Sequence, residues 1–373
     1  MDSCDVLVVG GGPAGSTCAG RLKQGGLDVL LMDREVFPRQ KPCAGWITPA
    51  VLQTLGIDGE EYRQGRVLQE ISSFRTGLID GSGLVTSYGI TVSYGIRRSE
   101  FDHYLLQRSG VRQALGEAVA TLERKDGCWI VNGRIRARML VGAGGHYCPV
   151  ARRLGARIGR EEVIAAQSAE YAMSPEEERL CRVQPDTPEL FFCRDMKGYG
   201  WLFRKGSFLN IGLGRRDSRH LGRHTSDFCR FLETRGDVPA GFSGRFRGHA
   251  YLLYDRRGGR SCVGDGALLT GDAAGLSHPQ SGEGILPAVE SALLAADTII
   301  AADGNYRRDR LEPYAERLAG HFGRGCTEMP SSPLSSLISR YLGARLLSSR
   351  WFSRHVVLDR WFLHRGRQVL YPE

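Results

Sequence analysis

The chain has 373 residues, of which 42% are hydrophobic and 24% charged, and 50 basic against 41 acidic residues give a formal net charge of +9. At this length we expect two domains rather than one hydrophobic core. No unbroken apolar run of membrane-spanning length occurs, and no recognised nucleic-acid-binding module accompanies the charge, so we expect no nucleic-acid partner. The ten cysteines contain no Cys-x-x-Cys pair, which predicts no metal site and a reduced, cytoplasmic protein.

The first predicted elements are a strand, a glycine-rich turn and a helix. The apolar run 6–9 predicts the strand, residues 10–15 (Gly-Gly-Gly-Pro-Ala-Gly) form the turn, and 16–22 show a helical pattern. Glycines let the backbone approach a pyrophosphate, and a helix start supplies unpaired N–H groups. A second strand at 29–32 ends at Asp33, which is placed to accept a hydrogen bond from a ribose hydroxyl. The residues of this predicted dinucleotide site are Gly10, Gly12, Pro13, Ala14, Gly15, Asp33 and Arg34.

A second glycine-rich motif, Gly271-Asp272, follows a predicted strand at 267–270 late in the chain. A nicotinamide cofactor needs one compact unit, whereas FAD is longer and its enzymes often return with a late strand that holds the ribityl chain. Asp272 is the predicted ribityl acceptor. Gly284 and Ile285 then open an apolar helix that runs to about residue 302. A helix N-terminus aimed at the flavin pyrimidine stabilises an anionic reduced ring, by about 0.3–1 kcal/mol when exposed and up to about 2 when partly buried.

Three further segments extend the pattern: Lys41-Pro42-Cys43-Ala44-Gly45, Arg98 within 97–102, and the alternation Tyr199-x-Trp201-x-Phe203 followed by a Gly-x-Gly at 212–214. With the two glycine motifs, they make the chain resemble the p-hydroxybenzoate hydroxylase superfamily of FAD-dependent oxidoreductases, and within it the geranylgeranyl reductase family. The resemblance covers about residues 5 to 325. The chain departs from the family pattern at three positions, which are Ala44, Gly144 in place of the usual aspartate, and Arg204 in place of proline.

The resemblance implies an α/β fold with a Rossmann-like FAD/NAD(P)-binding domain, an inserted α+β substrate domain and a C-terminal helical segment. Because the first and last FAD motifs bracket the rest of the chain, we expect the FAD-binding domain to be discontinuous. We assign it residues 1–70, 97–155 and 262–325. The predicted substrate domain is 71–96 with 156–261, and the predicted C-terminal helical cap is 326–373.

The activity implied is reduction of carbon–carbon double bonds in an isoprenoid or other apolar substrate, by hydride transfer from reduced flavin N5. FAD is held without a covalent bond, and electrons arrive from an external donor, NADPH or ferredoxin. Beyond the first glycine motif, the predicted cofactor contacts are Ala44, Gly45, Arg98, Val119 through its backbone at the adenine, Gly271, Asp272, Gly284 and Ile285.

The predicted catalytic residues are Cys43, Tyr199 and Trp201. A thiol in a dry pocket could donate the proton that alkene reduction requires, although Cys43 could equally be a small buried hydrophobe. Tyr199, Trp201 and Phe203 alternate along one strand and so share a face. This face could line the site of a polyprenyl chain, or it could pack against a helix.

Two further side chains are predicted to contact substrate. Lys41 could meet an anionic head group or the pyrophosphate, or could be solvated. His278 could tune the flavin or donate to the substrate, or could be an ordinary loop histidine.

The segment 331–373 contains seven arginines against two acidic residues, interleaved with aromatic side chains. Such a segment could lie on an anionic membrane surface, or it could be a helical cap whose arginines are solvated.

Two other functions use the same FAD-binding motifs. One is a flavin-dependent monooxygenase acting through a flavin hydroperoxide, and the other is a membrane-associated electron-transfer flavoprotein. No Trp-x-Trp-x-Ile-Pro segment supports halogenation.

Overall fold

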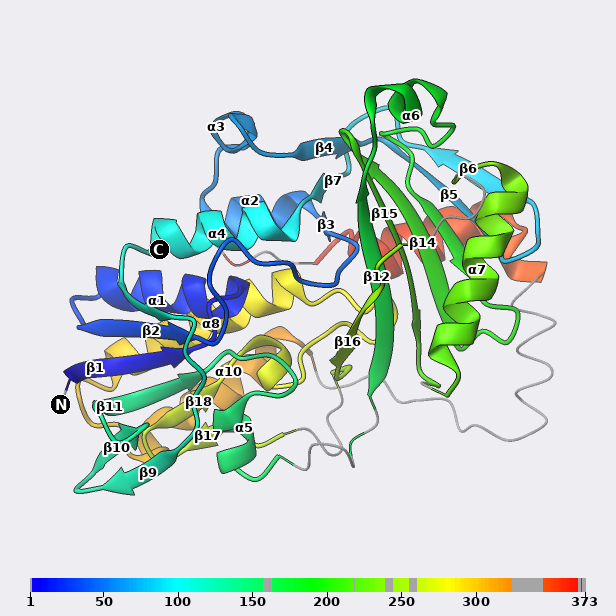
Figure 1. Ribbon diagram of the computed structural model, residues 1–373. Coiled ribbons are helices and arrows are strands. Elements are labelled where there is room, and N and C mark those ends of the chain that lie inside the picture. The colour runs from blue at the N-terminus through cyan, green and yellow to red at the C-terminus, as the bar shows by residue number, and fades with distance from the viewer. Residues whose placement is uncertain are drawn as a thin grey trace.

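The computed structural model describes residues 2–156, 161, 163–217, 219–238, 244–254, 260–323, 345–367 and 370. Its elements form two halves (Figure 1), one built on a mainly parallel sheet with helices and the other on a mainly antiparallel sheet. The fold class expected from the sequence is therefore confirmed.

The first half is organised by five parallel strands in the order β18-β11-β1-β2-β8. Its central strands are apolar runs because helices cover a parallel sheet on its faces. An antiparallel extension, β10 and β9, pairs with β11, and β17 pairs with β18. The strands of this sheet are β1 (Asp2–Val9), β2 (Val29–Asp33), β8 (Arg112–Leu115), β9 (Leu122–Lys125), β10 (Cys128–Val131), β11 (Ile135–Gly142), β17 (Val263–Gly264) and β18 (Ala267–Leu269).

Helices α1 (Pro13–Gln24) and α8 (Ile285–Ala301) pack against each other on this sheet, although their first residues are 272 positions apart in the sequence. Each helix has a proline in its first turn, where the missing N–H costs no hydrogen bond. The packing brings the early and late glycine motifs of the sequence to one edge of the sheet, where strands β1 and β18 end.

The second half contains a seven-stranded sheet in the order β16-β12-β15-β14-β13-β5-β6, in which only β5 and β13 pair in parallel. Helix α7 (Leu221–Arg235) covers one face of this sheet (Figure 1), where Phe228 is fully buried. The strands are β5 (Ser73–Leu78), β6 (Gly83–Ser87), β12 (Ile164–Ala172), β13 (Glu189–Phe192), β14 (Gly198–Lys205), β15 (Phe208–Arg215) and β16 (Arg247–Tyr251).

A third, three-stranded sheet joins the two halves. It consists of β3 (Trp46–Ile47), β7 (Ser93–Ile96) and β4 (Leu68–Ile71). Because β3 comes from the predicted segment 1–70 and β7 from 71–96, the boundary placed at residue 70 runs through a sheet. The domain limits stay predictions.

The remaining helices are short and connect these layers. They are α2 (Pro49–Leu55), α3 (Gly59–Arg63), α4 (Arg98–Ser109), α5 (Pro149–Arg153), α6 (Pro175–Leu180), the 3-10 turn η1 (Gly271–Ala273), α9 (Arg308–Leu311), α10 (Pro313–His321), α12 (Arg350–Phe352) and the π-helical η2 (Ser353–Phe362). Much of the predicted C-terminal cap, residues 326–344, lies outside the described residues.

Candidate active site

The glycine turn after β1 has the geometry that close approach of a phosphate requires. Gly10 has a φ of +113°, and a Cβ added to it would lie 2.4 Å from the carbonyl oxygen of Ala143. A Cβ on Gly15 would lie 1.7 Å from the oxygen of Gly10. Gly12 is the N-cap of α1, and no side chain caps this helix. The first-turn N–H groups have no partner within the helix, so the turn fits a pyrophosphate.

Asp33 lies beside this turn at the end of β2. Its Oδ2 accepts a hydrogen bond from the Gly11 N–H at 2.6 Å, and its Oδ1 accepts one from the Glu35 N–H at 2.9 Å. The side chain of Arg34 is 73% exposed. Val119 lies between β8 and β9, partly buried against the core. The ribose contact of Asp33 and the cofactor contacts of Arg34 and Val119 stay predictions.

Two arginines share one buried carboxylate next to the glycine turn. Arg98 makes a bidentate ion pair with Asp102, with both N–O distances 2.8 Å. Arg39 Nη2 lies 3.1 Å from the same carboxylate and 3.5 Å from where a Cβ on Gly12 would be. Its Nη1 is buried and has no hydrogen-bond partner among the described residues. One net positive charge and an unpaired donor at the start of α1 fit an anionic group such as the FAD pyrophosphate.

The late motif lies against the early one. Gly271 has a φ of +56°, and a Cβ on it would lie 3.2 Å from the Cβ atoms of Ala14 in α1 and Ala288 in α8. Gly284 is the N-cap of α8, again without a capping side chain, and Ile285 is the first residue of the helix. The two motifs that the sequence separates therefore form one continuous surface.

Asp272 lies at the centre of a polar cluster on this surface. Its Oδ1 accepts a hydrogen bond from Ser277 Oγ at 2.9 Å, and its Oδ2 lies 3.5 Å from Nε2 of His249. Lys41 Nζ donates to Nδ1 of His249 at 3.1 Å. His249 thus lies between a carboxylate and an ammonium group, and the three groups come from distant segments of the chain.

Burial and charge act in opposite directions on these groups. Burial raises the pKa of Asp272, but hydrogen bonding to His249 and the charges of His249 and Lys41 outweigh it and lower the pKa to about 2. Burial lowers the pKa of Lys41 to about 8, although Asp272 opposes this shift. Burial, together with Lys41, also lowers the pKa of His249. At neutral pH Asp272 is ionised, which suits an acceptor of ribityl hydroxyls.

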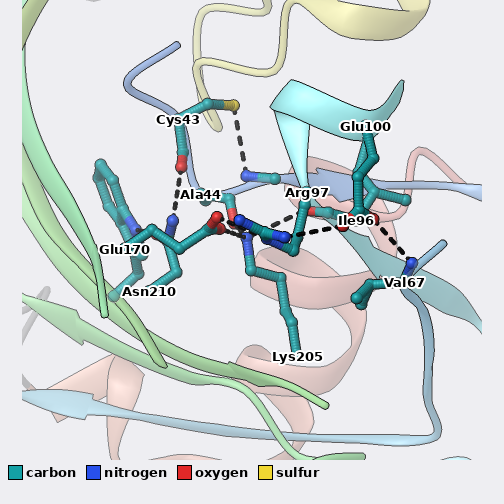
Figure 2. Close-up of polar contacts among 11 residues, drawn as sticks. Cys43, Ala44, Val67, Ile96, Arg97, Glu100, Glu170, Lys205 and Asn210 are labelled. Atoms are coloured by element: carbon teal, nitrogen blue, oxygen red, sulfur yellow. Dashed lines mark hydrogen bonds and ion pairs between the residues drawn. The ribbon is translucent and has the colours of Figure 1, made fainter. Parts of the chain in front are cut away.

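Cys43 lines a cavity of about 230 Å³ between the two halves, together with Lys41, Arg98 and Asn210. Its Sγ accepts a hydrogen bond from the Gly45 N–H at 3.3 Å, and its carbonyl accepts one from Asn210 Nδ2 at 3.0 Å (Figure 2). The cavity therefore brings Cys43, Lys41 and Arg98, all predicted from the sequence, into one place. Their catalytic and binding roles stay predictions.

Tyr199, Trp201 and Phe203 share one face of β14, as their alternation predicts. This face packs against the C-terminal segment, with ring centroids of Tyr199 and Phe362 5.4 Å apart. Phe362 also contacts Trp46 at 5.5 Å. The hydroxyl of Tyr199 donates to the carbonyl of Ser281, in the loop before α8. In the described residues the aromatic face is thus covered by a helix, the structural alternative to a substrate wall.

His278 is engaged by the C-terminal segment. Its Nε2 accepts from Arg367 Nη1 at 2.7 Å, and its ring stacks on His364 at 3.9 Å. Burial, with His364 and Arg367 nearby, lowers the pKa of His278 to about 2. His278, Glu283 and His364 place three ligand-type atoms within 4.8 Å of one another. The arginine donor already occupies the His278 nitrogen, so we assign no metal to this cluster.

The described part of the C-terminal segment has a buried and an exposed side. Val357, Leu358 and Phe362 are buried against the antiparallel sheet, whereas the Trp351 side chain is 66% exposed. Among the described residues, no helix has the length and apolar character needed to cross a membrane. The start of the basic segment, residues 331–344, lies outside the described residues.

Several polar residues of the site escaped the sequence analysis. Arg39 and Asp102 had local signals, because Arg39 precedes the Lys41 loop and Asp102 follows Arg98 by four residues in one helix, but the others had none. Lys41 and His249, for example, are 208 positions apart. The unpredicted residues that contact predicted ones are Arg39, Asp102, His249, Asn210 and Lys205.

The chain is similar to known flavoproteins over most of its length. The family model described as "FAD binding domain" matches residues 3–321. The menaquinone reductase of Mycobacterium tuberculosis is 31% identical over 352 residues, covering 87% of this chain and 82% of that protein. The geranylgeranyl diphosphate reductase of Rhodobacter capsulatus is 28% identical over 326 residues, covering 80% and 75%.

Solved structures show the same fold. A geranylgeranyl bacteriochlorophyll reductase-like protein from Thermoplasma acidophilum superposes with a TM-score of 0.74 at 21% identity, covering 93% of this chain and 88% of that one. A flavin-dependent brominase superposes with a TM-score of 0.71 at 18% identity, covering 97% and 92%. The fold is thus shared by proteins with different chemistry, and function has to be argued from the site.

Proposed function

Because the chain belongs to the geranylgeranyl reductase family of FAD-dependent oxidoreductases, we propose that it saturates carbon–carbon double bonds of an isoprenoid or similarly apolar substrate. Menaquinone and geranylgeranyl diphosphate, for which two relatives are named reductases, both carry a polyprenyl chain. The observation that carries the proposal is the position of Cys43. Its loop lies in a cavity between the FAD motifs and the antiparallel sheet.

The cofactor contacts follow from the site geometry. We propose that Arg98 and Arg39 bind the FAD pyrophosphate at the start of α1, where Asp102 leaves one positive charge unbalanced. Asp272, which is ionised, would accept hydrogen bonds from the ribityl chain, and the start of α8, which has no side-chain cap, would stabilise negative charge on the pyrimidine ring. When bound, FAD supplies two-electron hydride chemistry, and its electrons come from an external donor, NADPH or a ferredoxin.

The chain itself has to supply a proton. Saturating one double bond takes two electrons and two hydrogens, one arriving with the electron pair and the other as a proton on the neighbouring carbon. We propose that the Cys43 thiol gives this proton and regains it from water entering the cavity. Arg98 and Lys41 line the same cavity, where they hold the polar end of the substrate.

Apolar contacts dominate binding of such a substrate. Each buried CH2 group contributes about 0.8 kcal/mol, against association costs of about 4–15 kcal/mol. Basic side chains at the cavity, Lys41, Arg245 and Arg247, would select an anionic head group. The substrate chain would reach this aromatic face at Tyr199 only if Phe362 moved, because the ring of Phe362 packs against that of Tyr199. Trp201 and Phe203 lie on the same face.

The basic segment 331–373 is the proposed contact with an anionic membrane surface, where long isoprenoids reside. Its exposed Trp351 is flanked by Arg350 and Arg354, a combination that favours the interface between water and lipid.

The first test reduces the FAD-loaded protein anaerobically with dithionite and adds a geranylgeranyl compound. Flavin absorbance and product mass are followed together. Reoxidation of the flavin with a gain of two hydrogens per double bond supports the proposal. A flavin that stays reduced until oxygen enters, and then forms oxygenated product, would assign a monooxygenase instead.

Cys43→Ala gives the matching control for the proton donor. We expect it to keep FAD at the wild-type ratio and to lower turnover by about 100-fold or more. Cys128→Ala, which changes a partly buried thiol on β10 far from the cavity, should leave turnover unchanged. Wild-type turnover in Cys43→Ala would remove the thiol from the mechanism.

A further inference from the structure

Three successive carbonyl groups of the loop that carries Cys43 accept hydrogen bonds from donors of other elements, and Figure 2 shows those to Cys43 and Ala44. Asn210 Nδ2 donates to the Cys43 carbonyl at 3.0 Å, Lys205 Nζ to that of Ala44 at 3.2 Å, and the Ile96 N–H to that of Gly45 at 2.7 Å. We propose that Lys205 and Asn210 are positioning residues, which hold the loop and thereby keep the Cys43 thiol in a fixed place in the cavity. This inference rests on the function proposed for Cys43.

Lys205 acts through its backbone contacts, because its donors are fully used. The side chain is 1% exposed, and its ammonium group donates to the carbonyls of Ala44 and Ile96 and, at 2.7 Å, to Glu170. An ammonium group has three donors, so none remains for a substrate. Lys205 is therefore a clamp between the antiparallel sheet, the three-stranded sheet and the Cys43 loop.

Two glycines make room for this clamp. A Cβ on Gly45, which has a φ of +66°, would lie 2.7 Å from Lys205 Nζ and 2.2 Å from the Ile96 carbonyl oxygen. A Cβ on Gly95 would lie 3.0 Å from Lys205 Cγ. The backbone around Lys205 is thus shaped for a long side chain that ends at the loop.

The charges around the clamp balance. Glu170 accepts from Lys205 and, at 2.9 Å, from Arg97, which also pairs with Glu100 at 2.8 Å. Glu100 in turn accepts from the Val67 N–H (Figure 2). Two cations and two carboxylates leave no net charge to bury, a condition for a stable buried network. Burial raises the pKa of Glu170, but Lys205 and Arg97 outweigh it and lower the pKa, so Glu170 is ionised at neutral pH. Burial lowers the pKa of Lys205, and the charge and hydrogen bond of Glu170 oppose this shift.

Asn210 links the loop to the aromatic strand. Its Oδ1 accepts from Trp201 Nε1 at 2.9 Å, while its amide nitrogen donates to the Cys43 carbonyl. Because an indole N–H only donates, the orientation of the amide is determined. The side chain of Asn210 thus connects Trp201 and Cys43, which are both predicted as catalytic. If a substrate displaced Trp201, Asn210 would move and the position of the Cys43 thiol would change.

Asn210→Asp tests the asparagine. One carboxylate oxygen of the aspartate still accepts from Trp201. The other replaces the amide nitrogen, so the hydrogen bond to the Cys43 carbonyl is lost and two oxygen atoms repel each other there. We expect the alkylation rate of Cys43 by iodoacetamide, followed by peptide mass spectrometry in the FAD-loaded protein, to change by about tenfold, the factor that one lost hydrogen bond allows. Turnover should fall about 10- to 100-fold with KM nearly unchanged.

Asn132→Asp is the matched control. Asn132 lies in a remote turn, where its side chain bonds the backbone at residues 118, 120 and 121. It undergoes the same chemical change without touching the loop, and both Cys43 alkylation and turnover should stay at wild-type values. If Asn210→Asp also leaves both at wild-type values, the positioning role is overturned.

Two lysine variants separate positioning from stability. Lys205→Met removes one of the two cations that pair with Glu170, and this loss could unfold the protein. The double variant Lys205→Met/Glu170→Gln removes both charges. The remaining ion pair, Arg97 with Glu100, is then still balanced. We expect the double variant to fold and bind FAD while Cys43 alkylation stays altered and turnover stays low. Recovery of wild-type alkylation and turnover in the double variant would show a merely structural role and overturn the proposal.

Thiol alkylation also separates this inference from the proposed function. If no isoprenoid is reduced even by the wild type, but the Asn210 and Lys205 variants change Cys43 alkylation, the loop anchor stands and the proposed reaction fails. If the wild type reduces the isoprenoid and the variants match it in alkylation and turnover, the reaction stands and the anchor fails.

Discussion

Arg367 and Glu290 form an ion pair in which Nη2 and Oε2 are 2.9 Å apart, and it ties the end of the chain to the buried helix α8. Glu290 is fully buried and also lies 3.0 Å from Nε2 of His321. The same guanidinium donates to His278. One arginine thus closes the C-terminal segment over the loop that precedes α8.

Arg367→Met should lower the free energy of unfolding by about 3–5 kcal/mol, because it leaves the Glu290 carboxylate buried without its permanent cation. Urea denaturation measures the change. In Arg367→Met/Glu290→Gln the buried charge is also removed, and most of the loss should be recovered. A double variant as unstable as the single one would show that the loss came from packing rather than charge.

Lys41 predicts a specific pH dependence of stability in the FAD-free protein. Burial lowers its pKa to about 8 in the folded chain, against the ordinary lysine value of 10.5. Between these values the unfolded chain binds more protons, so the free energy of unfolding rises with pH, by up to about 3 kcal/mol across the window. Below pH 8 the penalty for burying the charge is fully present.

Lys41→Met removes this contribution. The difference in unfolding free energy between wild type and variant should therefore change across pH 8 to 10.5, with other titrating groups cancelling. Parallel pH profiles for the two proteins would mean that Lys41 titrates normally and is not buried as described.

Gly15→Ala should abolish FAD binding. The new Cβ would lie 1.7 Å from the Gly10 oxygen, so the turn that receives the pyrophosphate has to open. Gly320→Ala is the matched control, because a Cβ there meets nothing within 4 Å and should be neutral or stabilise by about 0.4–1 kcal/mol. The ratio of flavin to protein absorbance after purification measures both. Retention of FAD by Gly15→Ala would place the pyrophosphate elsewhere.

Trp351→Ser should weaken binding to vesicles that contain anionic lipid, since this exposed indole is the apolar anchor of the proposed membrane contact. Vesicle co-sedimentation measures the effect, and unfolding free energy should change by no more than about 0.5 kcal/mol because the side chain is at the surface. Equal sedimentation of wild type and variant, or none by either, would contradict the membrane contact and leave the segment as a helical cap.

Much of the fold was readable because its signals are local. The run 6–9 and the glycines after it specify a strand and a turn through residues within a few positions of one another, and the same holds for Gly284, Ile285 and the apolar helix that follows. The comparisons confirm the FAD-binding family that these motifs indicated. The alternation of Tyr199, Trp201 and Phe203 likewise placed them on one face.

What covers that face could not be read locally. Phe362 reaches Tyr199 across 163 positions of sequence, so the choice between a substrate wall and a packed face depends on where a distant helix lies. The partners of the predicted site residues have the same origin. His249 meets Lys41, and Asn210 meets Cys43, only because the antiparallel sheet lies against the FAD motifs.

Local sequence was sufficient for the cofactor class, the two glycine turns and the fold class, since backbone conformation and strand burial depend on neighbouring residues. Tertiary packing alone determined the approach of Arg39 to Asp102, the contacts of His249 with Asp272 and Lys41, and the clamp at Lys205. The physical reason is that a buried ionised group is stable only beside its counter-charge, and the partners of these groups come from segments distant in the sequence, brought together by the fold.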